Sequence, residues 1–217
     1  MIRLALAPSP FVGPNSWRPL ADVVSNSVVV DYGGVLPPDW YEGVAQRIAH
    51  EVDAEPWVAV LHSSAGGFAP ALAAVATSLK GFIFVDAVLP HPGRSALDIA
   101  PEAQIEGLRR LTTHGLMAPW NTWFDTDPTP HWIPDADARA AFLSDLPRTP
   151  FAFLEAVAPD SAAWEQLPAA FIQLSKGYEA NAARAEARGW PVRRAKLNHL
   201  AMVAQPRVMA GLLEGLP

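Results

Sequence analysis

The 217-residue sequence predicts an α/β fold: a doubly wound, mainly parallel sheet of about six strands, interrupted by a helical insertion. Short apolar runs alternate with segments of helical periodicity in the first half of the chain and again near its end. The apolar runs are continuous, which is typical of parallel strands that helices cover on both faces. Between them, residues of about 91–168 lose this rhythm and hold helix-like pieces joined by Pro- and Trp-rich connections.

Six apolar segments are expected to form the strands, because each is short, continuous and rich in β-branched or large apolar residues. They are residues 2–7, 27–32, 57–61, 82–85, 170–174 and about 191–197. Helices are expected where apolar residues recur every three or four positions. Such helices are expected to begin near Trp17, at Pro37 and Pro38, and after Pro206, and to span 66–79 and about 180–188. The helix that Pro37 and Pro38 open has one face of Trp40, Val44 and Ile48. The helix after Pro206 has Val208, Leu212 and Leu216 on one face.

The interruption divides the predicted domain into a core and an insertion. Residues 1–90 and 169–217 are expected to form the α/β core, and residues 91–168 a helical cap over it. Inside the cap, helix-like stretches lie at about 101–115, 136–144 and 150–156, and no clear strand is expected.

Composition excludes several classes of protein. Sixteen basic against 22 acidic residues give a formal net charge of −6, and no basic run offers a surface for nucleic acid. The absence of cysteine excludes disulfides, thiolate catalysis and Cys-zinc sites. No uninterrupted apolar stretch of about 18 residues predicts a membrane-spanning helix, and the N-terminal apolar run is too short for a secretion signal. We therefore expect a cytoplasmic monomer or homodimer without membrane contact.

A serine-containing turn between the third strand and the next helix is the strongest functional signal. Residues 61–67 read LHSSAGG, and the order strand, sharp turn with serine, helix is the context of a nucleophile elbow. The His-Ser pair directly after the strand favours Ser63 as the nucleophile, with Ser64 as the alternative. If Ser63 attacks, the N–H of Ser64 at the helix N-terminus can stabilise an oxyanion.

A serine nucleophile needs a base within hydrogen-bond reach. His199 follows the last predicted strand and precedes the final helix, which suits a base that comes late in the chain. The carboxylate that orients it is expected to be Asp86, at the end of the fourth strand and on the same sheet edge as the elbow. Glu179, just past the fifth strand, is the alternative.

At this point the sequence resembles the α/β-hydrolase superfamily, in particular its small, cap-bearing members common in actinobacteria. The resemblance covers nearly the whole chain and lies in SPFVGPNSW at 9–17, HSSAG at 62–66, VDAVLP at 85–90, GWPV at 189–192 and HLAM at 199–202. It implies a parallel sheet, a nucleophile on the elbow and a helical cap. By that comparison the chain lacks the two usual N-terminal strands and keeps about six.

Two departures from the family pattern concern the oxyanion site. The family usually has His-Gly after the strand at 2–7, whereas this chain has Pro8-Ser9. The next residue would donate the first oxyanion N–H, but Pro10 has none. Phe11 supplies that donor if the loop shifts by one residue. In addition, Leu61 replaces the usual glycine before the nucleophile.

These features favour a serine hydrolase that cleaves an ester, thioester, lactone or amide through a Ser-His-acid triad and an acyl-enzyme. One alternative is a non-hydrolytic biosynthetic enzyme, a lyase, cyclase or isomerase, that uses the Ser/His pair as acid and base. Another is a ligand-binding protein on the same scaffold. No H-E-x-x-H motif or carboxylate-rich loop predicts a metal, and no cofactor is expected.

Aromatic residues of the cap suggest the character of the substrate. Trp120, Trp123 and Trp132 supply large apolar surfaces, and Pro10 lies in the loop beside the expected oxyanion site. Apolar pockets with a few polar groups are the usual small-molecule sites. We therefore expect a small to medium hydrophobic acyl or aromatic substrate that contacts these four residues.

Overall fold

The computed structural model describes residues 2–33 and 40–217. Within these residues, six strands form one all-parallel sheet in the order β2-β1-β3-β4-β7-β8. The strands are β1 Arg3–Ala7, β2 Ser27–Val29, β3 Trp57–His62, β4 Leu79–Val85, β7 Ala169–Gln173 and β8 Val192–Arg194. This sheet, with helices on both sides, confirms the predicted fold class.

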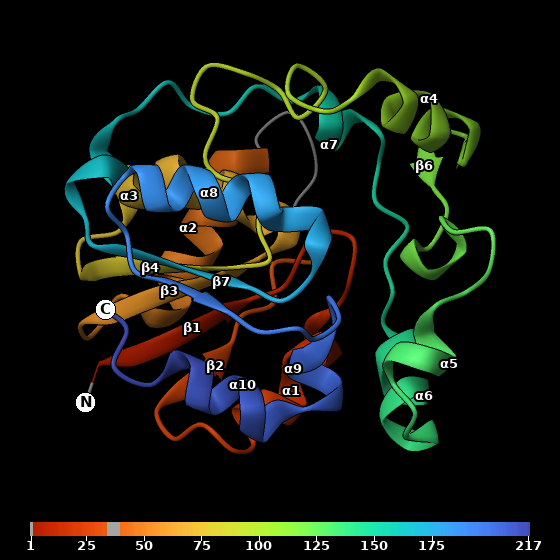
Figure 1. Cartoon of the computed structure of the whole chain (residues 1–217). Coiled ribbons are helices and arrows are strands. Elements are labelled where there is room, and N and C mark those ends of the chain that lie inside the picture. Colours follow the sequence, from red (N-terminus) through yellow and green to blue (C-terminus); the bar gives the residue numbers. More distant parts are fainter. Residues whose placement is uncertain (1, 34–39) are drawn as a thin grey trace.

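Helices cover the two faces of the sheet, and the chain termini lie near each other at its amino edge (Figure 1). One face carries α1 Arg18–Ala21, α9 Ala201–Ala204 and α10 Pro206–Leu213, and the other carries α2 Trp40–Val52, α3 Ala69–Val75 and α8 Glu179–Ala187. Every residue of the central strand β3 is buried. Helices on both faces explain why the strands are continuously apolar, because side chains on either face of the sheet are buried away from water.

The segment 91–168 lies largely beyond the carboxyl ends of the strands (Figure 1). It contains α4 Glu102–Arg110, η3 Trp120–Thr122, α5 Thr129–Trp132, α6 Ala136–Ser144, α7 Ala152–Glu155 and η4 Ala163–Gln166. Its last part returns to the core, where η4 contacts α3. The division of the chain at residues 90 and 169 stays a prediction.

The expectation that this segment holds no strand is wrong. The strands β5 Thr112–Thr113 and β6 Leu116–Met117 form a short antiparallel hairpin, and α4 ends before it, at Arg110 instead of near residue 115. His114 and Gly115 form the turn, with φ values of 51° and 76°. Positive φ at both central residues is typical of the type I′ turn, one of the common two-residue hairpin loops.

The helical segment expected at 66–79 instead runs from Ser63 to Val75, so it both starts and ends earlier than expected. A 3-10 helix, η2 Ser63–Phe68, leads into α3, which ends at Val75, and Leu79 belongs to β4. The Asp53 carboxylate accepts hydrogen bonds from the N–H groups of Thr77 and Ser78, at 2.8 and 2.7 Å, so this connection cannot continue the helix.

The other helix boundaries also differ in detail from those expected. The last helix ends at Leu213, so Leu216 lies beyond it. Pro37 and Pro38, expected to open the second helix, lie outside the described residues, whereas Val44 and Ile48 of α2 are buried as expected.

Candidate active site

Ser63 follows β3 directly and opens η2, as a nucleophile elbow requires. Its backbone is left-handed, with φ of 56°, a conformation that non-glycine residues rarely adopt. The turn is tight because the helix backbone passes the strand end closely: a Cβ on Gly66 would overlap the carbonyl oxygen of Val88. The Val88 N–H in turn donates to the Ser63 carbonyl, at 3.1 Å. The small residues after Ser63 are therefore needed for the turn itself.

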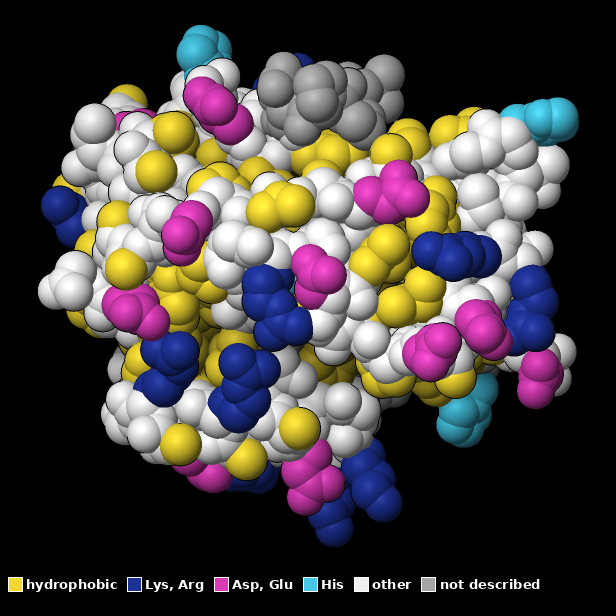
Figure 2. Space-filling model, turned by 90° about the horizontal axis from the view of Figure 1, so that it is seen from above, with side chains coloured by type: hydrophobic (Ala, Val, Ile, Leu, Met, Phe, Trp, Pro, Cys, Tyr) yellow, Lys and Arg dark blue, Asp and Glu magenta, His cyan; other side chains and the backbone are white. Residues whose placement is uncertain are grey.

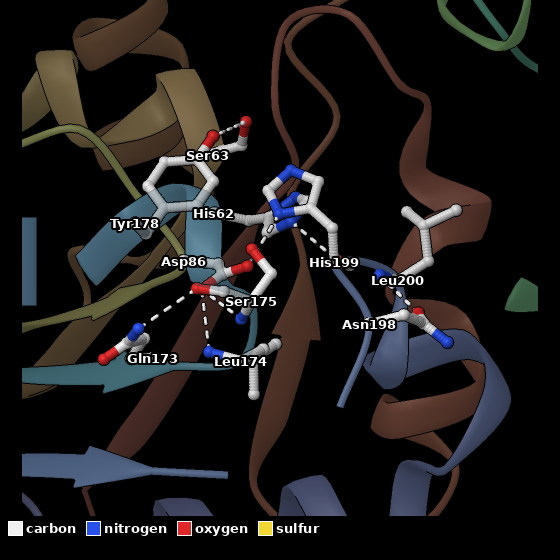
Figure 3. Close-up of polar contacts among 10 residues, drawn as sticks. All are labelled: His62, Ser63, Asp86, Gln173, Leu174, Ser175, Tyr178, Asn198, His199 and Leu200. Carbon is white, nitrogen blue, oxygen red and sulfur yellow. Dashed lines mark hydrogen bonds and ion pairs between the residues drawn. The ribbon is translucent and has the colours of Figure 1, made fainter. Parts of the chain in front are cut away.

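Asp86 and His199 meet at the carboxyl edge of the sheet (Figure 3). His199 Nδ1 lies 3.0 Å from Asp86 Oδ2, and the Asp86 side chain is fully buried. The other carboxylate oxygen, Oδ1, accepts hydrogen bonds from the N–H groups of Leu174 and Ser175, at 2.7 and 3.1 Å. Of the two expected carboxylates, the structure therefore brings Asp86 to the base, whereas Glu179 is exposed at the start of α8.

The loop that carries His199 is fixed on two sides. His62 Nε2 lies 3.0 Å from the His199 carbonyl oxygen, and the two imidazole rings are 4.4 Å apart. Burial holds the pKa of His62 well below its usual value, so this ring is neutral and Nε2–H donates to the carbonyl. Asn198 accepts from the Leu200 N–H at 2.8 Å and donates to the Trp132 carbonyl at 3.1 Å, which ties this loop to the insertion.

Tyr178 is a site residue that the sequence analysis missed. Its hydroxyl lies 3.0 Å from Ser63 Oγ, and its ring stacks on that of His199, with centroids 5.1 Å apart and planes at 5° (Figure 3). In this structure the Ser63 hydroxyl bonds to Tyr178, and it makes no hydrogen bond to His199. Ser64 lies one residue further into η2. Tyr178 thus contacts both Ser63, the favoured serine, through its hydroxyl and His199 through its ring.

The two expected oxyanion donors differ in their surroundings. Ser64 is the second residue of η2, where backbone N–H groups have no partner within the helix. The N–H of Phe11 is directed at Ser9 Oγ, at 3.4 Å, so it donates within its own loop. That loop is held by Thr149, whose hydroxyl donates to the Pro10 carbonyl at 2.6 Å.

The three tryptophans expected at the substrate lie in two places. Trp120 lies beside the base, with its ring centroid 6.4 Å from that of His199, and its ring contacts Trp132 at 5.9 Å. Trp123 instead packs on Phe11 at 4.9 Å. Trp120 therefore lies beside His199 with Trp132 packed on it, and Trp123 packs on the loop after β1.

A cavity of about 340 Å³ lies beside this loop, away from Ser63 and His199. Pro10 lines it, together with Tyr32, Trp40 and Phe68, and Asp145 and Arg148 of the insertion add charge. Of the residues expected to bind substrate, only Pro10 borders this cavity, whereas Trp120 lies beside His199.

The surface of the molecule carries a mixture of charged and apolar side chains. Figure 2 shows basic, acidic and apolar side chains interspersed on the face seen from above. Two Arg–Glu ion pairs lie at the surface, Arg188 with Glu165 and Arg194 with Glu186. Among the described residues, no helix combines the length and apolarity needed to cross a bilayer, and no cluster of three His, Asp or Glu side chains could hold a metal ion.

Comparison with known proteins identifies the fold. No protein-family model matches the chain, and no curated protein matches its sequence. Solved structures match it over 98% of its length. An extracellular α/β-hydrolase from a Paenibacillus species, described as sharing structural and functional homology with tobacco salicylic acid binding protein 2, has a TM-score of 0.77 at 15% identity over 98% of that chain.

Two further structures show the range of activities on this fold. A pyrethroid hydrolase from Sphingobium faniae JZ-2 has a TM-score of 0.70 at 13% identity over 95% of its chain. Tomato methylketone synthase I, in complex with β-ketoheptanoate, has a TM-score of 0.73 at 13% identity over 96% of its chain. The chain therefore has the α/β-hydrolase fold that its sequence resembles.

Proposed function

We propose that this protein is a serine hydrolase that cleaves an ester, thioester, lactone or amide of a small to medium hydrophobic substrate. The observation that carries the proposal is the pairing of His199 with the buried carboxylate of Asp86, 3.0 Å apart, next to a serine on a strained elbow. Three elements far apart in sequence supply these side chains. A buried carboxylate beside a loop histidine fixes the tautomer and orientation that a general base needs.

In the proposed mechanism Ser63 Oγ attacks the substrate carbonyl and His199 Nε2 takes the serine proton. Asp86 stabilises the imidazolium that forms, because a charge-assisted pair strengthens as His199 becomes positive. His199 then returns the proton to the leaving group, and water releases the acyl group from Ser63. The Ser64 N–H is the first oxyanion donor, and each such donor is typically worth about 3 kcal/mol of barrier.

Phe11 is the second donor in this proposal, and its use requires a local change. Its N–H must leave Ser9 Oγ, and the observed distance of 3.4 Å makes that hydrogen bond a weak one. The loss of such a bond is small compared with the gain from a charged acceptor.

The substrate class follows from the surroundings of the base. Trp120 and Trp132 present apolar rings on the side of the insertion, and they would contact an acyl chain or an aromatic group held near His199. We propose a small-molecule substrate of this kind. Cytoplasmic location and a monomeric or dimeric state stay predictions.

Turnover of activated esters by single-serine variants tests the proposal. We expect Ser63→Ala to abolish hydrolysis of short p-nitrophenyl esters, because it removes the attacking oxygen. Ser64→Ala serves as the matched control and should retain most activity, because its backbone N–H is kept. Hydrolysis that survives Ser63→Ala would contradict the assignment of the nucleophile.

A non-hydrolytic role is the second candidate, and one observation favours it. The Ser63 hydroxyl bonds to Tyr178 rather than to His199, so the pair is not aligned for proton transfer in this structure. A lyase, cyclase or isomerase could use the same groups as acid and base without an acyl-enzyme. One structural neighbour, the tomato methylketone synthase, is named for a synthase activity. A covalent acyl adduct on Ser63 distinguishes the hydrolase from this alternative and from a protein that only binds ligand.

A further inference from the structure

Tyr178 is the one tyrosine of three that contacts both the nucleophile and the base. It ends η5 Lys176–Tyr178, directly before α8, and points back toward Ser63 (Figure 3). The hydroxyl of Tyr32 instead donates to the Pro8 carbonyl, and the ring of Tyr41 packs on Phe68. The position of Tyr178 therefore gives its hydroxyl access to the reacting oxygen.

The Tyr178 hydroxyl can be the donor in its 3.0 Å hydrogen bond with Ser63 Oγ. Burial raises the pKa of Tyr178 to about 12, so the phenol keeps its proton at neutral pH and can donate. When Ser63 Oγ accepts this hydrogen bond, the proton of Ser63 itself is left for another acceptor. The proposed base is His199, whose ring stacks on Tyr178.

We propose that Tyr178 is a further catalytic residue, whose hydroxyl donates a hydrogen bond to Ser63 Oγ while that oxygen carries negative charge. This inference rests on the proposed serine-hydrolase function. During acylation the Ser63 proton passes to His199 Nε2, Oγ bonds to the carbonyl carbon, and the carbonyl π electrons move to its oxygen; the carbonyl then re-forms as the bond to the leaving group breaks and His199 protonates that group. During deacylation His199 takes a proton from water and the water oxygen bonds to the acyl carbon. The bond between Oγ and that carbon then breaks, its electron pair stays on Oγ, and His199 delivers the water proton to Oγ. Tyr178 keeps its own proton throughout.

The effect on rate follows from a difference in hydrogen-bond strength. A donor binds an oxygen that carries negative charge more strongly than a neutral hydroxyl. The Tyr178 hydroxyl therefore stabilises both transition states more than the resting enzyme, which is the condition for catalysis. Its ring additionally holds the plane of the His199 imidazole through the stacked contact.

Tyr178 acts on a different atom from the oxyanion donors. The loop of Phe11 follows β1, on one side of β3, whereas Tyr178 follows β7, on the other side. The hydroxyl contacts Ser63 Oγ itself and lies on the side of the base. Loss of Tyr178 should thus change the reactivity of the nucleophile and leave substrate binding unchanged.

Tyr178→Phe tests the role of the hydroxyl, because it keeps the ring that stacks on His199. We expect the rate of fluorophosphonate labelling of Ser63 and the deacylation rate of an acetyl-enzyme to fall about 10- to 100-fold, with KM for the ester unchanged. Tyr41→Phe is the matched control: it removes an interior phenol that contacts neither Ser63 nor His199, and both rates should stay at the wild-type value. Thermal unfolding of each variant shows that it is folded.

The outcomes separate this inference from the proposed function. Labelling of Tyr178→Phe at the wild-type rate or faster, while wild type is labelled at Ser63, overturns the role of the hydroxyl and leaves the hydrolase proposal intact. No labelling of Ser63 in folded wild type overturns both. A second variant, Tyr178→Leu, also removes the ring: slow labelling of this variant beside normal labelling of Tyr178→Phe would assign the effect to the stacked ring and contradict the proposal.

Discussion

Asp86 directly follows β4 in a left-handed conformation, with φ of 42°, and its carboxylate contacts both His199 and the chain after β7. Its sequence position predicted only the correct edge of the sheet. The choice between Asp86 and Glu179 depends on the backbone conformation of residues 174–178, and no local sequence pattern predicts that conformation. Two backbone N–H donors hold Oδ1, so Oδ2 is left to pair with the base.

Asp86→Asn should lower ester turnover by roughly 10²- to 10⁴-fold, because an amide cannot stabilise the imidazolium or fix the same tautomer of His199. Asparagine keeps an oxygen that can accept from Leu174 and Ser175, so the loss of activity should exceed any loss of stability. The measurement is kcat/KM on an activated ester at neutral pH. Glu179→Gln should keep wild-type turnover, because Glu179 is exposed. The reverse pattern would contradict the assignment of the acid.

Tyr178 shows why a site residue can escape sequence analysis. It follows the strand after which the family usually places its acid, and residues 175–179 read SKGYE. Nothing in an aromatic residue of such a loop distinguishes a surface side chain from one that folds back on the base. Its role depends on the 3-10 turn of η5, which aims it at Ser63.

At the level of elements, the elbow is the feature that the sequence predicted best. A strand followed by small residues and a helix has few structural solutions, and Ser63 takes the expected strained backbone. The hairpin of β5 and β6 and the end of α3 were harder to predict. Each depends on a detail that apolar periodicity does not predict: the positive φ of His114 and Gly115 in one case, and the hydrogen bonds of the Asp53 side chain, 24 residues from Thr77, in the other.

Gly66→Ala should destabilise the elbow, because the added Cβ would overlap the Val88 carbonyl and push η2 away from the strand end. We expect a loss of about 1–3 kcal/mol in the free energy of unfolding, the usual range for overpacked sites. Urea unfolding followed by circular dichroism measures it. Gly107→Ala in α4 is the control: open space surrounds Gly107, and alanine should stabilise that helix by about 0.5–1 kcal/mol. Equal effects of the two variants would refute the close approach.

At the scale of the whole molecule, the parallel sheet brings distant segments to one edge. Ser63 follows β3, Asp86 follows β4, Tyr178 follows β7 and His199 follows β8. Parallel strands all end at the same edge, so the sequence could predict that candidates after different strands would meet there. It could not predict the bond of Ser63 to Tyr178, nor the turn of Phe11 toward Ser9, because both depend on side-chain rotamers and loop paths.

Stability should fall as the solution becomes mildly acidic. Burial lowers the pKa of His62 and of His91 below the usual value. As the pH falls through about 6.5 the unfolded chain protonates both rings, whereas the folded chain protonates them only at lower pH, so the unfolded state binds more protons. Each histidine then costs up to about 1.4 kcal/mol of unfolding free energy per pH unit.

Urea unfolding between about pH 7 and pH 5 measures this dependence, in a window above the carboxylate titrations. His91→Gln should make the decline with falling pH shallower. His50→Gln, at an exposed position of α2, should leave it unchanged. A free energy of unfolding that stays constant or rises over this range would contradict the buried, neutral state of the two rings.

The most direct test of the account is the mass of the protein during turnover of an activated ester, followed by peptide mapping of any adduct. We predict a covalent acyl group on Ser63 that forms and then disappears as the ester is consumed, and that is absent in Ser63→Ala. Turnover without an adduct would favour the acid–base role without acyl transfer, and an adduct on Ser64 would contradict the proposed nucleophile.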